Sequence, residues 1–259
     1  MLKKSAFTLA EVLMVIGIIG AVSMLTVTNA RKGTDTAEKI TQLRKTHEIL
    51  ESVVQQAVME DGQIKNWQYM LTDTKTANAY QSEYVLKHIF NRLKLNKNCE
   101  TSSGCWASDI SGTSLYTTIN TKGDKPNSDT ASVKGILSND ASVSFYLSKA
   151  PTALTADQQT QFGYTGGDII GYITVDVNGT AKGNTKWGDD VFLFLWTIDD
   201  GIVPIGNNVA LNGANSCPNK LDICSAWAFY KGNEDYFKTC ANDTKMGLAW
   251  NDVSKASCK

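Results

Sequence analysis

The sequence predicts an α+β fold in which one long N-terminal helix, membrane-spanning in its first half, packs on an antiparallel β-sheet head. Three observations lead to this class. An apolar run over residues 7–27 continues into an amphipathic pattern that reaches about residue 60. Two later β-rich segments end in Asn-Gly or Asp-Gly turns, which are typical of hairpins. The C-terminal region is loop-rich and holds four of the six cysteines, so we expect disulfides there.

The composition argues against a nucleic-acid partner. The chain has 259 residues, of which 42% are hydrophobic and 20% charged, enough for one sizeable domain with an appendage or for two small domains. The formal net charge is −1, so the broad basic surface that nucleic-acid binding usually needs is not expected.

The apolar run follows two lysines and contains one carboxylate. A helix of its 21 residues would be about 31 Å long, which matches the hydrocarbon thickness of a bilayer. Lys3 and Lys4 then place the N-terminus in the cytoplasm and everything after Arg31 outside it. Glu11 lies near one end of the run, where an ionisable group costs less free energy than in the middle of a membrane. A secretory signal cleaved after Ala30 and an uncleaved signal anchor are two simpler interpretations.

The segment KKSAFTLAEVLMVIGIIGAV, residues 3–22, resembles the N-terminus of type IV pilins and of the pseudopilins of type II secretion. In that family a short basic leader is removed before a Phe, the new N-terminus is methylated, and a Glu lies four positions after the Phe. The resemblance implies cleavage after Ala6, methylation of Phe7 and a role in assembly for Glu11. The α-amine that cleavage creates at Phe7 would pair with the Glu11 carboxylate of a neighbouring subunit. This chain departs from the pattern at Ala6, where Gly is usual, and has no Pro late in the apolar run.

The same resemblance implies a domain organisation and a set of partners. The expected parts are a cleaved leader (residues 1–6), a transmembrane and filament-core helix (7–30) and an exported head (31–259) on which a helix at 31–60 packs. The expected partners are other copies or related pilins, a prepilin peptidase that also methylates, and an assembly platform in the inner membrane. The chain would be held in the bacterial inner membrane, with one span and its N-terminus inside, before it enters a cell-surface or periplasmic filament.

The pattern after the apolar run predicts the elements of the head. A helical stripe ends at Asp61-Gly62 and consists of Ile40, Leu43, His47, Leu50, Val54, Ala57 and Val58. A second helix is expected at residues 82–95, and His47 and His88 are interpreted as packing or surface residues. About four strands should follow, in the segments 141–148, 168–179, 190–201 and 202–206, with a further strand possible at 114–119.

The six cysteines indicate an oxidising compartment, because their spacing does not match that of metal sites. A cysteine-closed C-terminal loop also resembles pilins. A preference for short loops favours the pairs Cys99–Cys105, Cys217–Cys224 and Cys240–Cys258, although other pairings remain open.

No catalytic motif stands out, so we expect neither an enzyme nor a cofactor. Only two histidines are present, and sequences such as GxSxG, HExxH or a phosphate-binding loop are absent. The stretch from Asp176 begins like a calcium loop but lacks its Gly and its last ligand. A looser calcium site at Asp176, Asn178, Asp189 or Asp190 is the alternative to a polar hairpin turn, and we expect no metal.

The expected function is therefore a structural subunit of a type IV pilus-like filament. Three alternatives remain: a pseudopilin of a secretion system, a minor tip pilin that binds a surface, DNA or another cell, and a signal-anchored exported enzyme. The scarcity of histidine argues against the enzyme.

The N-terminal residue of the mature protein distinguishes the interpretations of the apolar run. We expect N-methylated Phe7 when the protein is purified from its own host and its N-terminal peptide is analysed by mass spectrometry. Arg31 as first residue would indicate a secretory signal instead, and Met1 would indicate an uncleaved anchor.

Overall fold

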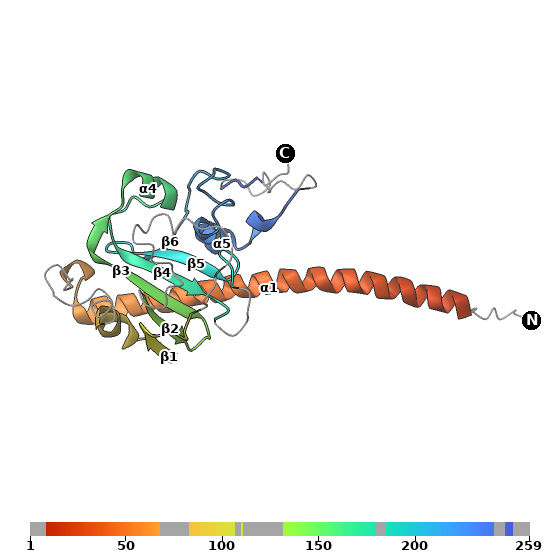
Figure 1. Cartoon of the computed structure of the whole chain (residues 1–259), viewed down its shortest axis with the longest axis horizontal. Coiled ribbons are helices and arrows are strands. Elements are labelled where there is room, and N and C mark those ends of the chain that lie inside the picture. Colours follow the sequence, from red (N-terminus) through yellow and green to blue (C-terminus); the bar gives the residue numbers. More distant parts are fainter. Residues whose placement is uncertain are drawn as a thin grey trace, which may run out of the picture. The chain divides into compact units, whose positions relative to one another are not determined.

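The structure, a computed structural model of the chain, describes residues 9–67, 83–106, 110, 132–179, 185–240 and 247–250. Side chains are described for all of these except residues 9–34 and 149. The chain divides into two compact units, Met1–Glu38 and Lys39–Lys259, and the second unit contains the β-sheet (Figure 1).

Helix α1, Leu9–Asp61, contains 53 residues and supplies one layer of the second unit. From residue 40 on, its apolar residues recur at helical spacing and are buried, namely Ile40, Leu43, Leu50, Val53, Val54 and Ala57. The helix ends at Gly62, whose φ of 84° is the left-handed conformation that glycine adopts at low cost after a helix. A short 3₁₀ turn, η1 (Ile64–Asn66), follows.

The described strands form one antiparallel sheet of six, with each strand next to its neighbour in the chain. The strands are β1 (Leu95–Glu100), β2 (Val133–Leu137), β3 (Ser142–Ala153), β4 (Asp168–Asp176), β5 (Val191–Thr197) and β6 (Ile202–Pro204). The β3–β4 and the β4–β5 pairings each have a register shift near Gly171, where an added Cβ would lie 2.1 Å from the carbonyl oxygen of Tyr146. Glycine therefore permits the two backbones to come this close.

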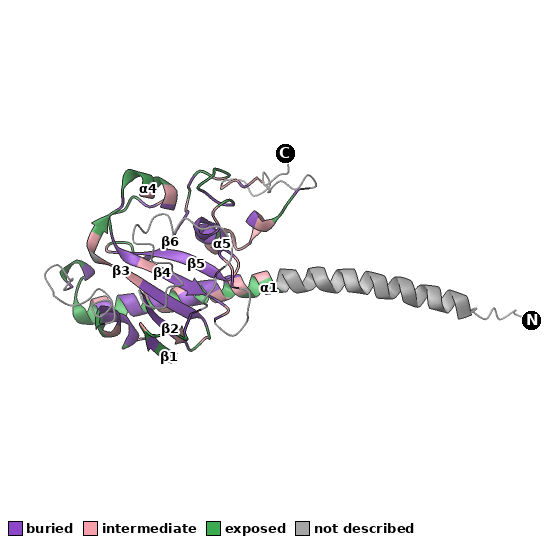
Figure 2. Ribbon diagram, in the orientation of Figure 1, coloured by how far each residue is buried: buried purple, intermediate pink, exposed green. Residues whose placement is uncertain are grey.

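Both faces of the sheet are covered at β5, which is buried along its whole length (Figure 2). On one face the ring of Phe194 lies 5.5 Å from that of His47 on α1, measured between centroids. Side chains alternate along a strand, so the neighbouring Leu195 and its partner Tyr172 belong to the other face. There helix α4 (Ala156–Phe162) places Phe162 against Tyr172, with centroids 6.1 Å apart.

The C-terminal region packs beside β5 and β6 through short helical turns. These are η3 (Asp222–Cys224), α5 (Ser225–Lys231) and η4 (Asp235–Phe237). The hydroxyl of Ser225 accepts a hydrogen bond from the backbone N–H of Leu193 at 2.8 Å, and Ala226 N–H donates to the carbonyl of Ile205 at 2.9 Å. These bonds join the segment to the end of the sheet.

The predicted fold class is wrong in its membrane-spanning part. Among the described residues, none of the helices combines the length and the apolar character that a bilayer crossing requires. Helix α1 instead continues without a break to Asp61, and from Asp35 on its described surface mixes exposed polar and buried apolar positions. An apolar helical stretch is typical of a membrane span and equally of a helix buried in protein. The length and hydropathy of residues 7–27 did not separate these two cases.

The order of elements also differs from the prediction in the middle of the chain. In place of a helix at 82–95, the structure has a helical turn that widens into the π-helix η2 (Leu86–Phe90), and β1 begins at Leu95. Strands β1 and β2 were not predicted, because the first is mostly exposed and the second contains a lysine and a glycine. The possible strand at 114–119 lies outside the described residues.

Leu50 provides a test of the packing of α1 on the sheet. Its side chain is 1% exposed, so Leu50→Ala should lower the free energy of unfolding by about 2–5 kcal/mol. Met59 on the same helix is 82% exposed, and Met59→Ala should change that free energy by about 0.5 kcal/mol or less. Urea unfolding of residues 31–259, followed by circular dichroism, measures both. Equal losses in the two variants would contradict the packing described.

Candidate functional site

The residues that the sequence singled out for processing and assembly lie at the chain's N-terminal end. Ala6 and Phe7 fall outside the described residues. Glu11 lies in helix α1, but its side chain is not among those described. The described part of the chain shows the contacts by which the head holds α1. These contacts, called the anchorage, are the candidate functional site.

Two of the expected disulfides are formed. Cys99 and Cys105 close a loop after β1, with their Cα atoms 6.0 Å apart, and Cys217 and Cys224 close the loop before α5, with theirs 5.1 Å apart. Cys240 is disulfide-bonded as well. Its expected partner, Cys258, lies outside the described residues.

The first anchor of α1 is the ammonium group of Lys39. It lies 2.5 Å from Oδ1 of Asp189 and 3.1 Å from Oδ1 of Asp190, both just before β5. The Lys39 side chain is only 10% exposed. Burial by itself lowers the pKa of this lysine, but the two carboxylates outweigh it and the net pKa is raised. The amine therefore stays charged and paired.

The turn after β4 is hydrogen-bonded to this anchor. Asn178 donates a side-chain hydrogen bond to Asp190, and the backbone N–H groups of Asn178 and Gly179 donate to Oδ1 of Asp176, each at 3.1 Å. Asp176 is fully buried, and its Oδ2 has no hydrogen-bond partner among the described residues. Burial, with the nearby Asp190 carboxylate, raises the pKa of Asp176 to about 7.

The alternative calcium site falls in this cluster and is not supported. The Lys39 ammonium group occupies the position between Asp189 and Asp190 where a cation would be attracted. In the described part of the chain, no group of three or more His, Cys, Asp or Glu side chains is arranged to hold a metal ion. The carboxylates instead bind a cation that the chain itself supplies.

A second anchor joins α1 to the edge strand β6 at a single residue, Ile202. Nε2 of His47 lies 2.6 Å from the carbonyl oxygen of Ile202. The backbone N–H of Ile202 donates a hydrogen bond to the carboxylate of Glu51. His47 and Glu51 are one helical turn apart, so both reach the same stretch of strand. The preceding Gly201 has a φ of 70°, and an added Cβ there would lie 2.7 Å from the Glu51 carboxylate.

A third anchor lies at the turn between β2 and β3. The side-chain amide of Gln42 donates to the carbonyl oxygen of Asn139 at 2.5 Å. The Asn139 amide donates in turn to the hydroxyl of Thr46 at 3.0 Å, and Thr46 is fully buried. Polar groups on the buried side of α1 thus find partners in the sheet, as buried polar groups must.

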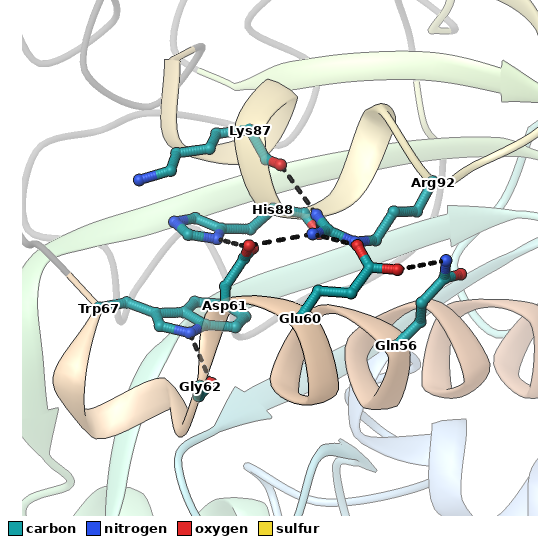
Figure 3. A network of polar contacts seen from close by, with 8 residues as sticks. All are labelled: Gln56, Glu60, Asp61, Gly62, Trp67, Lys87, His88 and Arg92. Carbon is teal, nitrogen blue, oxygen red and sulfur yellow. Dashed lines mark hydrogen bonds and ion pairs between the residues drawn. The ribbon is translucent and has the colours of Figure 1, made fainter.

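The C-terminal end of α1 is held by a network of charged side chains around Arg92 (Figure 3). The Arg92 guanidinium lies 2.7 Å from Glu60 and 3.1 Å from Asp61, and it also donates to the backbone carbonyls of Lys87 and His88. One arginine therefore ties the last turn of α1 to η2. Carboxylates at a helix C-terminus are unfavourable for the helix dipole, and the guanidinium offsets this.

His88 completes this network and is positioned by packing. Its Nδ1 lies 2.7 Å from Oδ2 of Asp61, and its ring stacks on Trp67 at 4.1 Å with an angle of 4° between the planes. Burial lowers the pKa of His88, and Asp61 offsets only part of this. Burial raises the pKa of Asp61, but the His88 hydrogen bond and the Arg92 charge outweigh it, so the net pKa is lowered. A neutral imidazole therefore donates to an ionised carboxylate.

The described contacts of both histidines belong to the groups that hold α1. His47 contacts Ile202 and the rings of Phe194 and Phe229. His88 contacts Asp61 and Trp67. Sequence reasoning placed both as packing residues but missed Lys39, Glu51 and Arg92 as anchors. The sequence did contain one signal for an anchor, because His47 and Glu51 are two polar residues one helical turn apart beside the buried stripe.

Comparisons with known proteins leave the family open: no family model, no curated protein and no solved structure matches this chain.

The buried carboxylate of Asp176 gives a prediction about pH. Its pKa is about 7 in the folded protein against an ordinary value of 3.8, so the folded state binds this proton more tightly than the unfolded state and loses stability as the pH rises between these values. Asp176→Asn keeps the acceptor oxygen and removes the ionisation. It should make the protein more stable than the wild type at pH 8, and this advantage should shrink as the pH falls to 4.

Urea unfolding at a series of pH values measures this advantage. Asp168→Asn, at the exposed first residue of the same strand, is the matched control and should show no such trend. An advantage of Asp176→Asn that does not change with pH would contradict the assignment.

Proposed function

We propose that the chain is the structural subunit of a type IV pilus-like filament, assembled through its N-terminal helix. The observation that carries the proposal is the sequence of residues 3–22, in which a basic leader, a Phe, a Glu four residues later and an apolar run follow in the order typical of pilins. The proposed processing is cleavage after Ala6 by a prepilin peptidase, with methylation of Phe7.

The length of α1 supports this role. The helix is described without interruption from Leu9 to Asp61, so the segment that carries Glu11 and the segment that packs on the sheet belong to one element. Apolar residues dominate the first part, and a helix that is apolar on all sides requires burial. Packing against the helices of other copies provides that burial in a filament.

The anchorage supports a mechanical task. A subunit held in a filament by its helix bears load where the helix joins the head. In this chain the joint combines a buried apolar stripe with polar anchors near the start, the middle and the end of the packed segment, at Lys39, the pair His47 and Glu51, and Asp61. Because these anchors attach to different parts of the head, sliding the helix by one turn would break all of them together.

The disulfides support export. Disulfides persist in oxidising compartments and are rare in the cytosol. The head forms Cys99–Cys105 and Cys217–Cys224, and Cys240 is bonded too. A cell-surface or periplasmic filament, built from other copies or related pilins by an ATP-driven platform in the inner membrane, fits this chemistry.

Glu11 provides the test of the proposed function. Its carboxylate would pair with the α-amine of Phe7 on a neighbouring subunit, since two charges in an apolar environment are each costly unless they are paired. Glu11→Gln keeps the size and removes the charge. It should still lose its leader and yet enter filaments poorly, whereas Glu11→Asp, with a shorter reach, should show an intermediate defect.

Filaments sheared from the cells, and compared with total cellular protein by immunoblot, measure assembly. Wild-type chain that never enters such filaments would overturn the proposed function. Glu11→Gln that assembles at the wild-type level would remove the pairing while leaving the filament itself in place.

A further inference from the structure

An open groove of about 620 Å³ lies in the head at the C-terminal end of α1. Its walls are the last turns of α1, the segment that follows it through η1, and the turn between β5 and β6. Of the anchor residues, Glu51 lines this space, and the described part of the chain leaves it open.

Five apolar side chains line this groove. Val54 and Ile64 are buried, and Val58 and Ile198 are partly buried. Met59 also lines it, with 82% of its surface exposed. Of the described large hydrophobic residues only Met59 and Tyr230 count as exposed, and Met59 has the larger exposed fraction. Methionine adapts its shape to an incoming partner more readily than branched residues do.

Carboxylates outnumber cations around the groove. Three carboxylates line it, those of Glu51, Asp199 and Asp200, against one cation, Lys65. Glu51 accepts the backbone N–H of Ile202 and Asp200 accepts the Tyr164 hydroxyl at 2.9 Å, so both are held in place. Asp199 is exposed, and no hydrogen bond or ion pair of its side chain is described. A partner that carries apolar residues next to positive charge would complement this lining.

We propose that the groove receives the segment of α1 around Arg31 and Lys32 of a second copy of this chain. This inference rests on the proposed function, since only a chain that assembles with itself brings that segment to a neighbouring head. It assigns to the filament a second contact between copies, in addition to the contact at Glu11.

The sequence itself selects this segment. Adjacent basic residues occur at three places, Lys3-Lys4, Arg31-Lys32 and Arg44-Lys45. The first pair belongs to the leader that the proposed cleavage removes. In the third, Arg44 already donates to the carbonyl oxygen of Phe229 at 2.6 and 2.9 Å.

The remaining pair also has the apolar neighbours that the groove needs. Met24 and Val27 precede Arg31 at spacings of seven and four residues, which in a helix bring residues to one face. This sequence pattern, two apolar residues and a cation at helical spacing, matches a groove lined by apolar residues and carboxylates. An amphipathic helix laid into a groove is a recurring mode of recognition.

Exchange of charge tests the pairing. Asp199→Lys should lower the amount of subunit in sheared filaments about tenfold or more, because attraction becomes repulsion. Arg31→Glu should do the same, and the two changes together should restore assembly. Asp157→Lys, at an exposed carboxylate on α4, is the control and should leave assembly unchanged.

A cross-link tests the same contact by distance. Met59→Cys combined with Val27→Cys should give covalent dimers and higher species when filaments are oxidised and run without reductant. Tyr230→Cys with Val27→Cys, at the other exposed large hydrophobic, should not. Val27 and Met59 of one chain lie in the same helix, 32 residues apart, and cannot reach each other, so oxidised filaments that yield monomer alone would overturn the proposal.

The outcomes separate this inference from the proposed function. If wild-type chain forms no filament, the proposed function fails. If it forms filaments and Asp199→Lys assembles normally, the groove is not a contact between copies. If Asp199→Lys assembles poorly and Arg31→Glu does not restore it, the occupant is not this segment. Because Asp199 is exposed, the thermal unfolding temperature of Asp199→Lys should equal that of the wild type. Met59→Glu, at another exposed position in the groove, serves as a second variant and should also lower the amount of subunit in filaments.

Discussion

The packing of α1 against one face of the sheet is the contact on which the rest of the head depends. A helix isolated in water gains little stability from its own hydrogen bonds, and most of its stability in a protein comes from burying one face. Leu43, Leu50 and Ala57 are at most 1% exposed, and they supply this face. The sheet needs the helix in return, because the apolar side chains on that face would otherwise meet water.

Apolar packing alone leaves the position of the helix loosely set, and the polar anchors remove that freedom. Each anchor matches one group on α1 to one group at a particular place on the sheet: Lys39 before β5, Gln42 at the β2–β3 turn, and His47 with Glu51 at β6. A shift along the axis would separate these partly buried groups from their partners, which opposes such a shift.

The sequence predicted those parts whose pattern is strong and local. The buried stripe of α1, its end at Asp61, and strands β4 and β5 with their turns follow from helical spacing, strand-like runs and Asx-Gly pairs. The prediction that the first half of α1 spans a membrane was wrong, because the hydropathy of a helix does not tell whether lipid or protein surrounds it. Strand β1 was missed since its residues are mostly exposed. Helix α4 was missed although Thr155 and Gln158 form a capping box around its first turn.

The candidate site could be predicted only in part for a related reason. Glu11 and the cysteines stood out as unusual residues within their segments. The anchors of α1 did not, because Lys39, Glu51 and Arg92 are ordinary residues for the surface of a helix or loop. They become anchors through partners that lie about 30 to 150 positions away, such as Asp189 for Lys39. Local spacing gives a signal for Glu51, one turn from His47, but it does not identify the distant partner of any of these residues.

The bonds at Ile202 have a consequence for how this protein resists aggregation. A strand at the edge of a sheet presents free backbone groups, and these invite pairing with the edge of another molecule. Strand β6 is such an edge, three residues long, and both the N–H and the carbonyl group of Ile202 are taken by side chains of α1. A second copy therefore finds no strand to extend there. The helix that would build an ordered polymer also closes this route to a disordered one.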